Sequence, residues 1–193
     1  MIEFNNREIS CEEFSNADFT AYDFSAFQID ETVFRNCIFS DSVFVDASLH
    51  YVEFIGCEIT SSFTDSLLDR VFFDECLISG STFISTRMRN TEFRSCQARY
   101  VTFDESTIKN VIIASSNFAD SSFSDLSCKN FKINDSDLTS SAFVSTSLSS
   151  VDLHGSIMSG IIISESKVEL KGARLDVSQS LDIIRLLGVD VVY

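Results

Sequence analysis

The sequence lacks proline and tryptophan altogether and has only two histidines among its 193 residues. No apolar run approaches the ~18 residues of a membrane-spanning helix, and the first residues, MIEFNNREIS, lack the basic and apolar regions of a signal peptide. Basic residues are scarce: 14 stand against 29 acidic ones, for a net charge of −15. These absences argue against direct binding to nucleic acid or to an anionic membrane, and they predict a cytoplasmic protein.

What the chain has instead is an apolar residue at every fifth position. From Phe4 the step of five runs to Ile59, a single step of four leads to Phe63, and the step of five continues to Val168. All 34 of these positions are apolar, although hydrophobic residues make up only 45% of the chain, so the pattern is not accidental. A strand alternates with a period of about 2 and a helix with about 3.6, so neither element explains it.

The residue two positions before each central residue is mostly small, and the other three places of each pentad are mainly polar. A large and a small residue two apart lie on one side of a short strand, while Ser, Asp, Asn and Thr suit turns. Taking every fourth pentad separates a phenylalanine column from an aliphatic column. The phenylalanine column is Phe4, Phe24, Phe44, Phe63, Phe83, Phe103, Phe123, Phe143 and Ile163, and the aliphatic column is Ile9, Ile29, Leu49, Leu68, Met88, Ile108, Cys128, Leu148 and Val168. Four pentads therefore form one four-sided coil, and the four-residue step still turns one corner.

The pentads resemble the A/C/S–D/N–L/F–S/T–x motif of the pentapeptide-repeat proteins over residues 2–170. The resemblance implies a right-handed quadrilateral β-helix, an all-β solenoid with four pentads in each square coil. It divides the chain into a β-helix domain at residues 1–170 and a C-terminal capping or dimerisation segment at residues 171–193.

The six cysteines include no CxxC pair, which predicts reduced thiols. Cys37, Cys57, Cys76 and Cys96 share one column of small residues, between Ala17 and Ser116. Coils ~4.8 Å apart would stack these thiols in a line, whereas metal ligands converge on a point. The sequence therefore favours packing over a metal site.

The C-terminal segment predicts a helix over residues 177–187, followed by a strand from Val189 to Tyr193. Asp176 and Gln179 form a capping-box pattern, and Gly188 suits a left-handed C-terminal position. An apolar stripe of Val177, Leu181, Ile184 and Leu187, widened by Ile183 and Leu186, runs along the helix. On physical grounds alone this segment is either a lid over the last coil or an interface with a second copy.

The same segment resembles the C-terminal tail of the Qnr and MfpA proteins, the quinolone-resistance subgroup of the family. The residues that match this tail are Leu175, Asp176, Gln179, Ser180, Leu187, Gly188 and Val189, and FRSCQAR at 93–99 resembles a Qnr coil. The resemblance implies a homodimer joined through Val177, Leu181, Ile184, Leu187, Val189 and Val191. The register leaves no room for the extended loops of many Qnr proteins, so the chain is more similar to the loop-less MfpA type.

Enzymatic interpretations find little support in the sequence. There is no glycine-rich phosphate loop, no GxSxG and no HExxH motif. His50 and His154 fall on different walls about five coils apart, roughly 25 Å at strand spacing, and cannot share a site. We therefore expect no enzymatic activity and no cofactor.

The distribution of charge suggests a binding function. Asp46, Asp65, Glu105 and Asp125 share one corner column two positions after the phenylalanine wall. Four arginines interrupt this column at mid-rod, and we expect them to pair with Glu92 and Glu105; they are Arg87, Arg89, Arg94 and Arg99. With coils ~4.8 Å apart, the rod is about 40 Å long and carries about one net charge per 2.7 Å, against one per ~1.7 Å in duplex DNA. With the resemblance, this predicts a DNA mimic that binds DNA gyrase or topoisomerase IV and protects it from fluoroquinolones or inhibits it. The alternative is an acidic structural module with an unrelated protein partner, because acidic surfaces also serve solubility.

Overall fold

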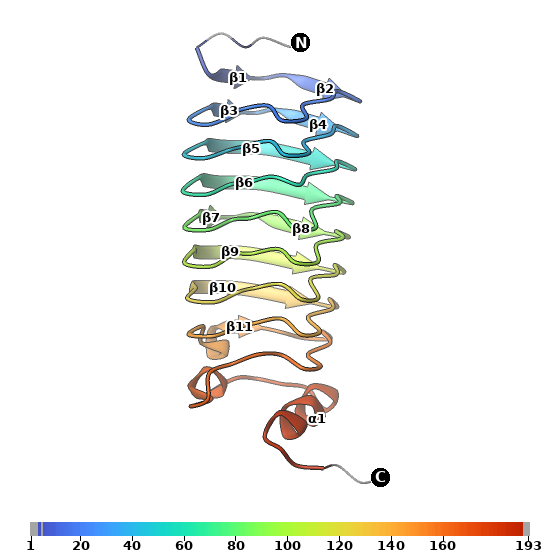
Figure 1. Cartoon of the computed structure of the whole chain (residues 1–193), viewed down its shortest axis with the longest axis vertical. Coiled ribbons are helices and arrows are strands. Elements are labelled where there is room, and N and C mark those ends of the chain that lie inside the picture. The colour runs from blue at the N-terminus through green and yellow to red at the C-terminus, as the bar shows by residue number, and fades with distance from the viewer. Residues whose placement is uncertain (1–3, 5, 191–193) are drawn as a thin grey trace.

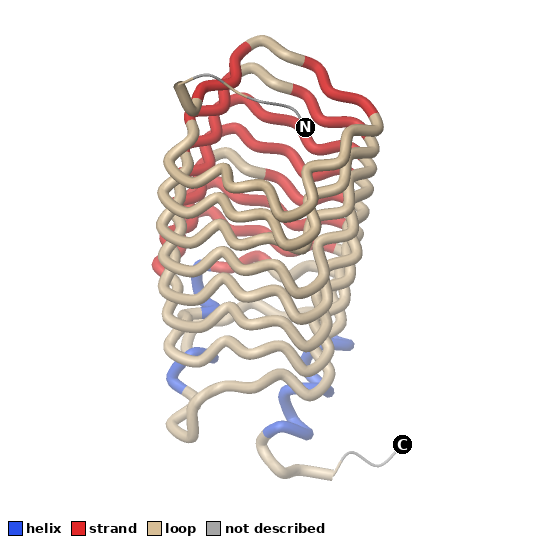
Figure 2. The backbone as a smooth tube through the Cα atoms, turned by 45° about the horizontal axis from the view of Figure 1, so that its top comes forward, coloured by secondary structure: helices blue, strands red, loops and turns tan. Residues whose placement is uncertain are grey.

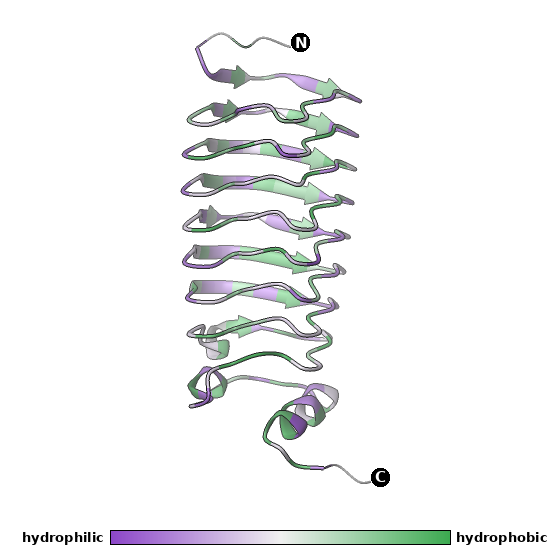
Figure 3. Cartoon of the chain, in the orientation of Figure 1, coloured by the Kyte–Doolittle hydropathy of each residue, from purple (hydrophilic) through white to green (hydrophobic). Residues whose placement is uncertain are grey.

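The chain forms, in a computed structural model, a column of stacked coils with one α-helix at its C-terminal end (Figure 1). The structure describes residue 4 and residues 6–190. The β-solenoid expected from the five-residue period is confirmed. Hydrophilic and hydrophobic residues mix within every coil instead of separating along the rod, as Figure 3 shows.

The strands lie on two adjacent sides of the column and pair in parallel with the same position of the next coil. Four long strands turn the corner between these sides: β5 (Ser48–Ile55), β6 (Leu67–Asp74), β9 (Thr107–Ala114) and β10 (Ser127–Asn134). In the other coils the two sides carry separate short strands: β1 (Glu8–Ser10), β2 (Glu13–Ser15), β3 (Gln28–Asp30), β4 (Val33–Arg35), β7 (Arg87–Arg89), β8 (Glu92–Arg94) and β11 (Val151–Asp152). Isolated parallel bridges join the coils on the remaining two sides, which are drawn as loops in Figure 2.

We number the four faces in chain order by their inward-pointing central residues. Face one holds the phenylalanine column that starts at Phe4, and face two holds the aliphatic column that starts at Ile9. Face three holds Phe14, Phe34, Phe54, Phe73, Phe93, Ile113, Ile133 and Leu153, and face four holds Phe19, Phe39, Ile59, Ile78, Ala98, Phe118, Leu138 and Met158. Each edge between two faces is turned by the residue two positions after a central residue.

Rings on face one stack from coil to coil. The centroid of the Phe63 ring lies 4.5 Å from that of Phe44 and 4.7 Å from that of Phe83. The interplanar angle is 8° in both pairs. Such offset stacking adds to the free energy of burying the rings. The phenylalanine column is therefore continuous across the four-residue step, as the sequence predicted.

The four-residue step omits one corner residue. Nearly every corner residue has positive φ, but no residue between Gly56 and Asp65 does, so the left-handed position is the one missing. Ser61 keeps its inward place, with Oγ donating to the Phe39 carbonyl at 2.6 Å. Because the missing residue belongs to the turn and not to the strand, the core register survives.

The repeat ends differently from the expectation at Val168. Val168 is 60% exposed, whereas Glu169 is 2% exposed and turned inward. The chain leaves the pentad register at the 3-10 helix η2 (Val168–Leu170), one coil below η1 (Leu148–Ser150). The Glu169 carboxylate accepts hydrogen bonds from the N–H groups of Ser145 at 3.0 Å and Ser164 at 3.3 Å. Placing Val168 in the core was therefore wrong, because this carboxylate must lie inside to accept those bonds.

The predicted helix is confirmed as α1 (Val177–Leu186). Asp176 and Gln179 form the expected capping box, and Gly188 has φ 77°. Val189 and Asp190 are not in a strand, so the expected strand does not begin at Val189; residues 191–193, including Val191, lie outside the described residues.

Candidate interaction surface

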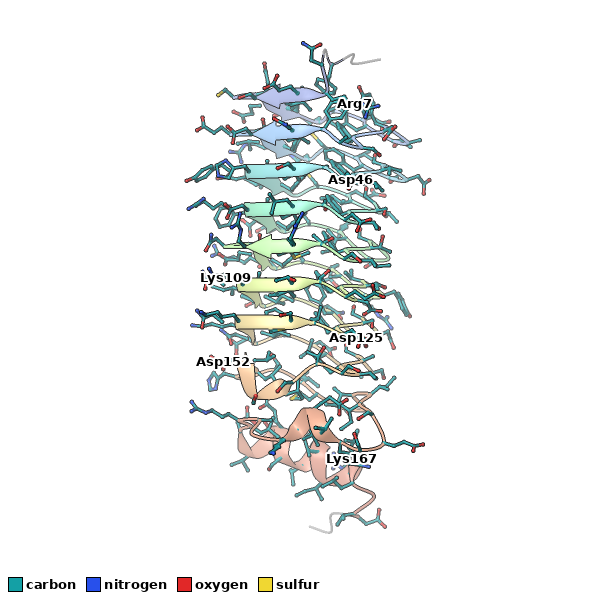
Figure 4. All side chains as sticks on the ribbon, turned by 90° about the vertical axis from the view of Figure 1, so that its left-hand side faces the viewer. Arg7, Asp46, Lys109, Asp125, Asp152 and Lys167 are labelled. Carbon is teal, nitrogen blue, oxygen red and sulfur yellow. The ribbon has the colours of Figure 1, made fainter. Side chains whose placement is uncertain are left out.

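The four acidic residues expected to contact a partner form one column on the surface, which we call the acidic edge. Asp46, Asp65, Glu105 and Asp125 all occupy the corner between faces one and two, with φ between 55° and 60°. All four are exposed. The backbone N–H of Asp46 donates to the carbonyl of Thr64 in the coil below at 3.1 Å. The backbone N–H of Asp125 donates to the carbonyl of Val144 at 2.9 Å. These bonds fix the corner residues of successive coils one above another, at the spacing of the coils. Figure 4 shows Asp46 and Asp125 along the same margin of the rod.

No basic residue neutralises the acidic edge. None of the four carboxylates forms an ion pair within the described part of the chain. The pentads of face one and this edge contain no lysine or arginine, but they also contain Asp23, Asp104 and Glu165. Face one and the acidic edge therefore form a mainly anionic side of the rod, with one cation near its N-terminal end, where the Arg7 guanidinium donates to the Ser25 carbonyl at 3.2 Å.

The backbone explains part of this pattern without any function. A left-handed corner favours Gly, Asn and Asp, whose small or short polar side chains tolerate positive φ. Corner residues on the other edges include Asn16, Asn36 and Asp120. An aspartate at a corner therefore needs no functional reason, whereas Glu105 gains little from this geometry. The absence of cations is the more informative observation.

Several acids elsewhere on the rod are paired. Arg94 lies 2.5 Å from Glu92, as expected, and Arg35 lies 2.9 Å from Glu13. The expectation that mid-rod arginines also pair with Glu105 was wrong. Arg99, on face four, instead bonds Asp120 at 2.6 Å, one coil below. Face one separates Arg99 from the acidic edge, so Glu105 stays without a cation.

Basic residues collect beside the edge between faces two and three, at the outward position of face two that precedes the corner. Arg89, Lys109 and Lys129 occupy the same register position in successive coils, and we call this column the cationic edge. Arg87, Lys132 and Arg174 lie near it in the same part of the chain. Our reasoning from the sequence missed this column, although a basic residue at every twentieth position from Arg89 was visible there.

The histidines do not form a catalytic arrangement with each other. His50 lies on face two, with Nδ1 2.8 Å from Asp30 Oδ1 and Nε2 3.9 Å from Asp69 Oδ2. His154 lies on face three, where its backbone N–H donates to the Asp152 carboxylate at 3.3 Å. His50 is thus part of a surface network that also contains Arg70, 3.2 Å from Asp69.

The cysteine ladder is a packing feature of face four. The thiols of Cys57, Cys76 and Cys96 are fully buried and donate to the carbonyls of Phe34, Phe54 and Phe73 at 3.3, 3.3 and 3.4 Å. Burial raises the pKa of Cys96 to about 11 and also raises that of Cys37. Protonated thiols bound to carbonyls, as those of Cys37 and Cys96 are, make poor nucleophiles and poor metal ligands.

The two sides of α1 have different environments. On the side facing the rod, Ile183 is buried and Gln179 Nε2 donates to the carbonyls of Leu153 at 2.5 Å and Ser156 at 2.9 Å. This contact makes the helix a lid on the last coil.

The residues expected at a dimer interface lie mainly on the other side. Val177, Leu187 and Val189 are 83%, 52% and 53% exposed, and Leu181 and Ile184 are half-buried. The lid therefore leaves these apolar side chains exposed or half-buried among the residues that the structure describes. No helix in the described residues has the length and apolar character needed to cross a membrane.

Known proteins offer the following similarities. Residues 9–83 match the sequence model of a family described as pentapeptide repeat region. A structure of QnrB1, a plasmid-mediated fluoroquinolone resistance protein, is 19% identical, with 96% of this chain and 100% of that chain covered and a TM-score of 0.44. HetL, a pentapeptide repeat protein involved in heterocyst differentiation regulation in the cyanobacterium Nostoc sp. strain PCC 7120, is 14% identical over 81% of this chain and 88% of that chain, with a TM-score of 0.37. A search of curated protein sequences finds no match.

Proposed function

We propose that the chain, which folds as a β-solenoid and whose residues 9–83 match the pentapeptide repeat model, is a DNA mimic of the Qnr and MfpA type. In this proposal it binds DNA gyrase or topoisomerase IV and protects the enzyme from fluoroquinolones or inhibits it. The observation that supports it most is the acidic edge, whose four carboxylates are exposed, recur at the coil spacing and form no ion pair with any described residue.

The spacing of charge is the physical basis of the mimicry. A groove that binds DNA carries basic side chains arranged for phosphates, which follow one another every ~1.7 Å along the duplex axis when both strands are counted. One edge supplies at most one carboxylate per coil, about every 4.8 Å. Asp104 and Glu165 on the same side raise this density, and so does Asp23, although Arg7 lies close to it. A rigid anionic rod can thus occupy such a groove in place of the duplex.

The exposed side of α1 supports a homodimer as part of the proposal. Val177, Leu181, Ile184, Leu187 and Val189 would bury apolar area against the same residues of a second copy, in a two-fold contact at the C-terminal end. V177D combined with L187D is expected to give a monomer in sedimentation, while S178D, on the polar side of the same helix, leaves the dimer intact. A dimer that persists in V177D/L187D would contradict this interface.

The decisive measurement is gyrase supercoiling with added protein, in the presence and absence of ciprofloxacin, repeated with topoisomerase IV. We expect inhibition of supercoiling at micromolar protein, or restored supercoiling when the drug is present. The chain itself is expected to have no enzymatic activity and to act in the cytoplasm. No effect on either topoisomerase from the source organism would end the proposal.

Charge reversal locates the contact. D46K combined with D65K is expected to weaken the effect at least about tenfold, the loss of roughly 1.4 kcal/mol of binding free energy. The matched control is E75K with D135K, which makes the same charge change at two left-handed, exposed corners of the edge between faces three and four. D46N with D65N tests the charge in a residue that favours the same backbone. Equal loss in the control would show that only the net charge matters.

A second candidate function is an acidic module that binds an unrelated basic protein. The observation in its favour is that carboxylates also lie on faces three and four, where corner geometry accounts for residues such as Asp120 and Asp135. Retention of a different protein by the wild-type chain but not by D46K/D65K, with no topoisomerase effect, would favour this function.

A further inference from the structure

The cationic edge places like charges directly against one another. Lys109 pairs in register with Lys129 below it and with Arg89 above it. Like charges opposite each other in neighbouring strands oppose pairing. Lys109 and Lys129 form no ion pair within the described residues, and both are exposed. The column therefore holds two repelling cations that the chain itself does not neutralise.

The opposite margin of the same face carries the complementary charge. Glu105 and Lys109 belong to one coil, and Asp125 and Lys129 belong to the next. Each carboxylate lies on the edge between faces one and two, and each lysine lies beside the edge between faces two and three. Figure 4 shows Asp125 and Lys109 at opposite margins of this face. Face two is thus anionic on one side and cationic on the other, at matching levels along the rod.

Little stands between the two margins in these coils. The outward residues there are Thr107 and Ser127, which are small, polar and exposed. They follow one another in register, as Thr107 pairs with Ser127 in β9 and β10. Because these hydroxyl side chains are small, another surface can approach both charged margins together.

We propose that this half of face two binds face two of a second copy, with the rods parallel and related by a two-fold axis along their length. Such an axis exchanges the two margins and keeps every coil at its own level. Glu105 of each copy then meets Lys109 of the other, and Asp125 meets Lys129. The contact is isologous and closes as a dimer.

The charges favour a second copy over a nucleic acid. The acidic edge repeats with the same coil spacing as the cationic edge, because both arise from one solenoid, whereas phosphates do not follow that spacing. The net charge of −15 repels a second copy and a polyanion alike at long range, so the register of the contact decides between them. At ~0.15 M salt the Debye length is about 8 Å, so distant charges are screened more than pairs in contact. The contact is expected to be weak and to disappear at ~0.5 M salt.

The test is a charge swap on the full chain, followed by sedimentation velocity at ~0.15 M and ~0.5 M salt. K109E with K129E is expected to weaken lateral association at least about tenfold, and so is E105K with D125K. An equimolar mixture of these two variants should associate again, since all margins of one are anionic and all margins of the other are cationic. A chain with all four substitutions should also associate with itself, because the pattern is only reversed.

The controls separate this contact from the end-to-end joining through α1. An apolar contact at α1 persists at ~0.5 M salt, whereas the lateral contact does not, so loss of one leaves the other measurable. E75K with D135K, on another edge, should leave lateral association unchanged. Absence of a salt-sensitive step in the wild type, or failure of the mixture to associate, would overturn the proposal. Binding of a DNA duplex through Lys109 and Lys129 without self-association would overturn it as well.

Discussion

Replacing Phe83 by alanine tests whether the stacked rings hold the coils together. Phe83 is fully buried, and its ring lies between those of Phe63 at 4.7 Å and Phe103 at 5.1 Å. It also meets the edges of Phe73 at 6.0 Å and Phe93 at 5.8 Å. One substitution therefore removes contacts within its own coil and with both neighbouring coils.

The expected cost follows from these contacts. Truncating a buried phenylalanine to alanine typically costs about 3–5 kcal/mol, and each aromatic pair is worth about 0.5–1.5 kcal/mol beyond its buried area. With four such pairs lost and no free chain end nearby to fill the cavity, F83A is expected near the upper limit, about 5 kcal/mol. F83L keeps aliphatic bulk and should cost less, about 2 kcal/mol.

Urea unfolding followed by far-UV circular dichroism measures the change, since the chain has no tryptophan. The matched control is F72A, which removes the same side chain beside Phe73 from a position that is 39% exposed. F72A should shift the free energy of unfolding by less than about 1 kcal/mol. Equal destabilisation by F83A and F72A would refute the argument that ring stacking inside the column carries the stability.

The remaining predictions concern the four-residue step and the end of the rod. Inserting an asparagine after Thr60 restores the missing left-handed corner and should change stability by less than about 1 kcal/mol, whereas the same insertion after Val101 shifts the strand register and should unfold the coil, as thermal melting would show. Glu169 is buried, which would raise its pKa, but hydrogen bonds from the backbone and Ser164 outweigh burial and lower the pKa below its usual value. Its stabilising contribution is therefore complete above the unfolded pKa, ~4.3, and is lost as the pH falls through the lower folded value. E169Q should make the unfolding free energy less dependent on pH between about 6 and 3 than in wild type, and an unchanged dependence would contradict this.

The sequence was sufficient to predict the coil, because the constraint is local and repeated. Every pentad needs one large inward residue, one small inward residue and one corner residue. The residue type at each position therefore indicates whether that position points inward or turns a corner. The capping box at Asp176 and Gln179 was predictable for the same reason, since its partners lie three residues apart. The column of Asp46, Asp65, Glu105 and Asp125 followed from counting coils.

Contacts between side chains of different faces, and contacts at the C-terminal end of the rod, could not be predicted from the repeat. Arg99 pairs with Asp120 and not with Glu105. A long side chain can contact acids on two faces and in two coils, and only the three-dimensional distances decide which of them it pairs with. Glu169 replaces Val168 in the core because the N–H groups of Ser145 and Ser164 need an acceptor where the next coil is absent.

The sequence by itself determined the period, the four faces and the order of residues on each, because a solenoid converts spacing along the chain directly into position in space. Only the tertiary structure decided which side of α1 rests on the rod, which corner the short step omits, and which charges remain unpaired. These depend on distances between residues that are remote in sequence or on different faces, and no local pattern encodes them.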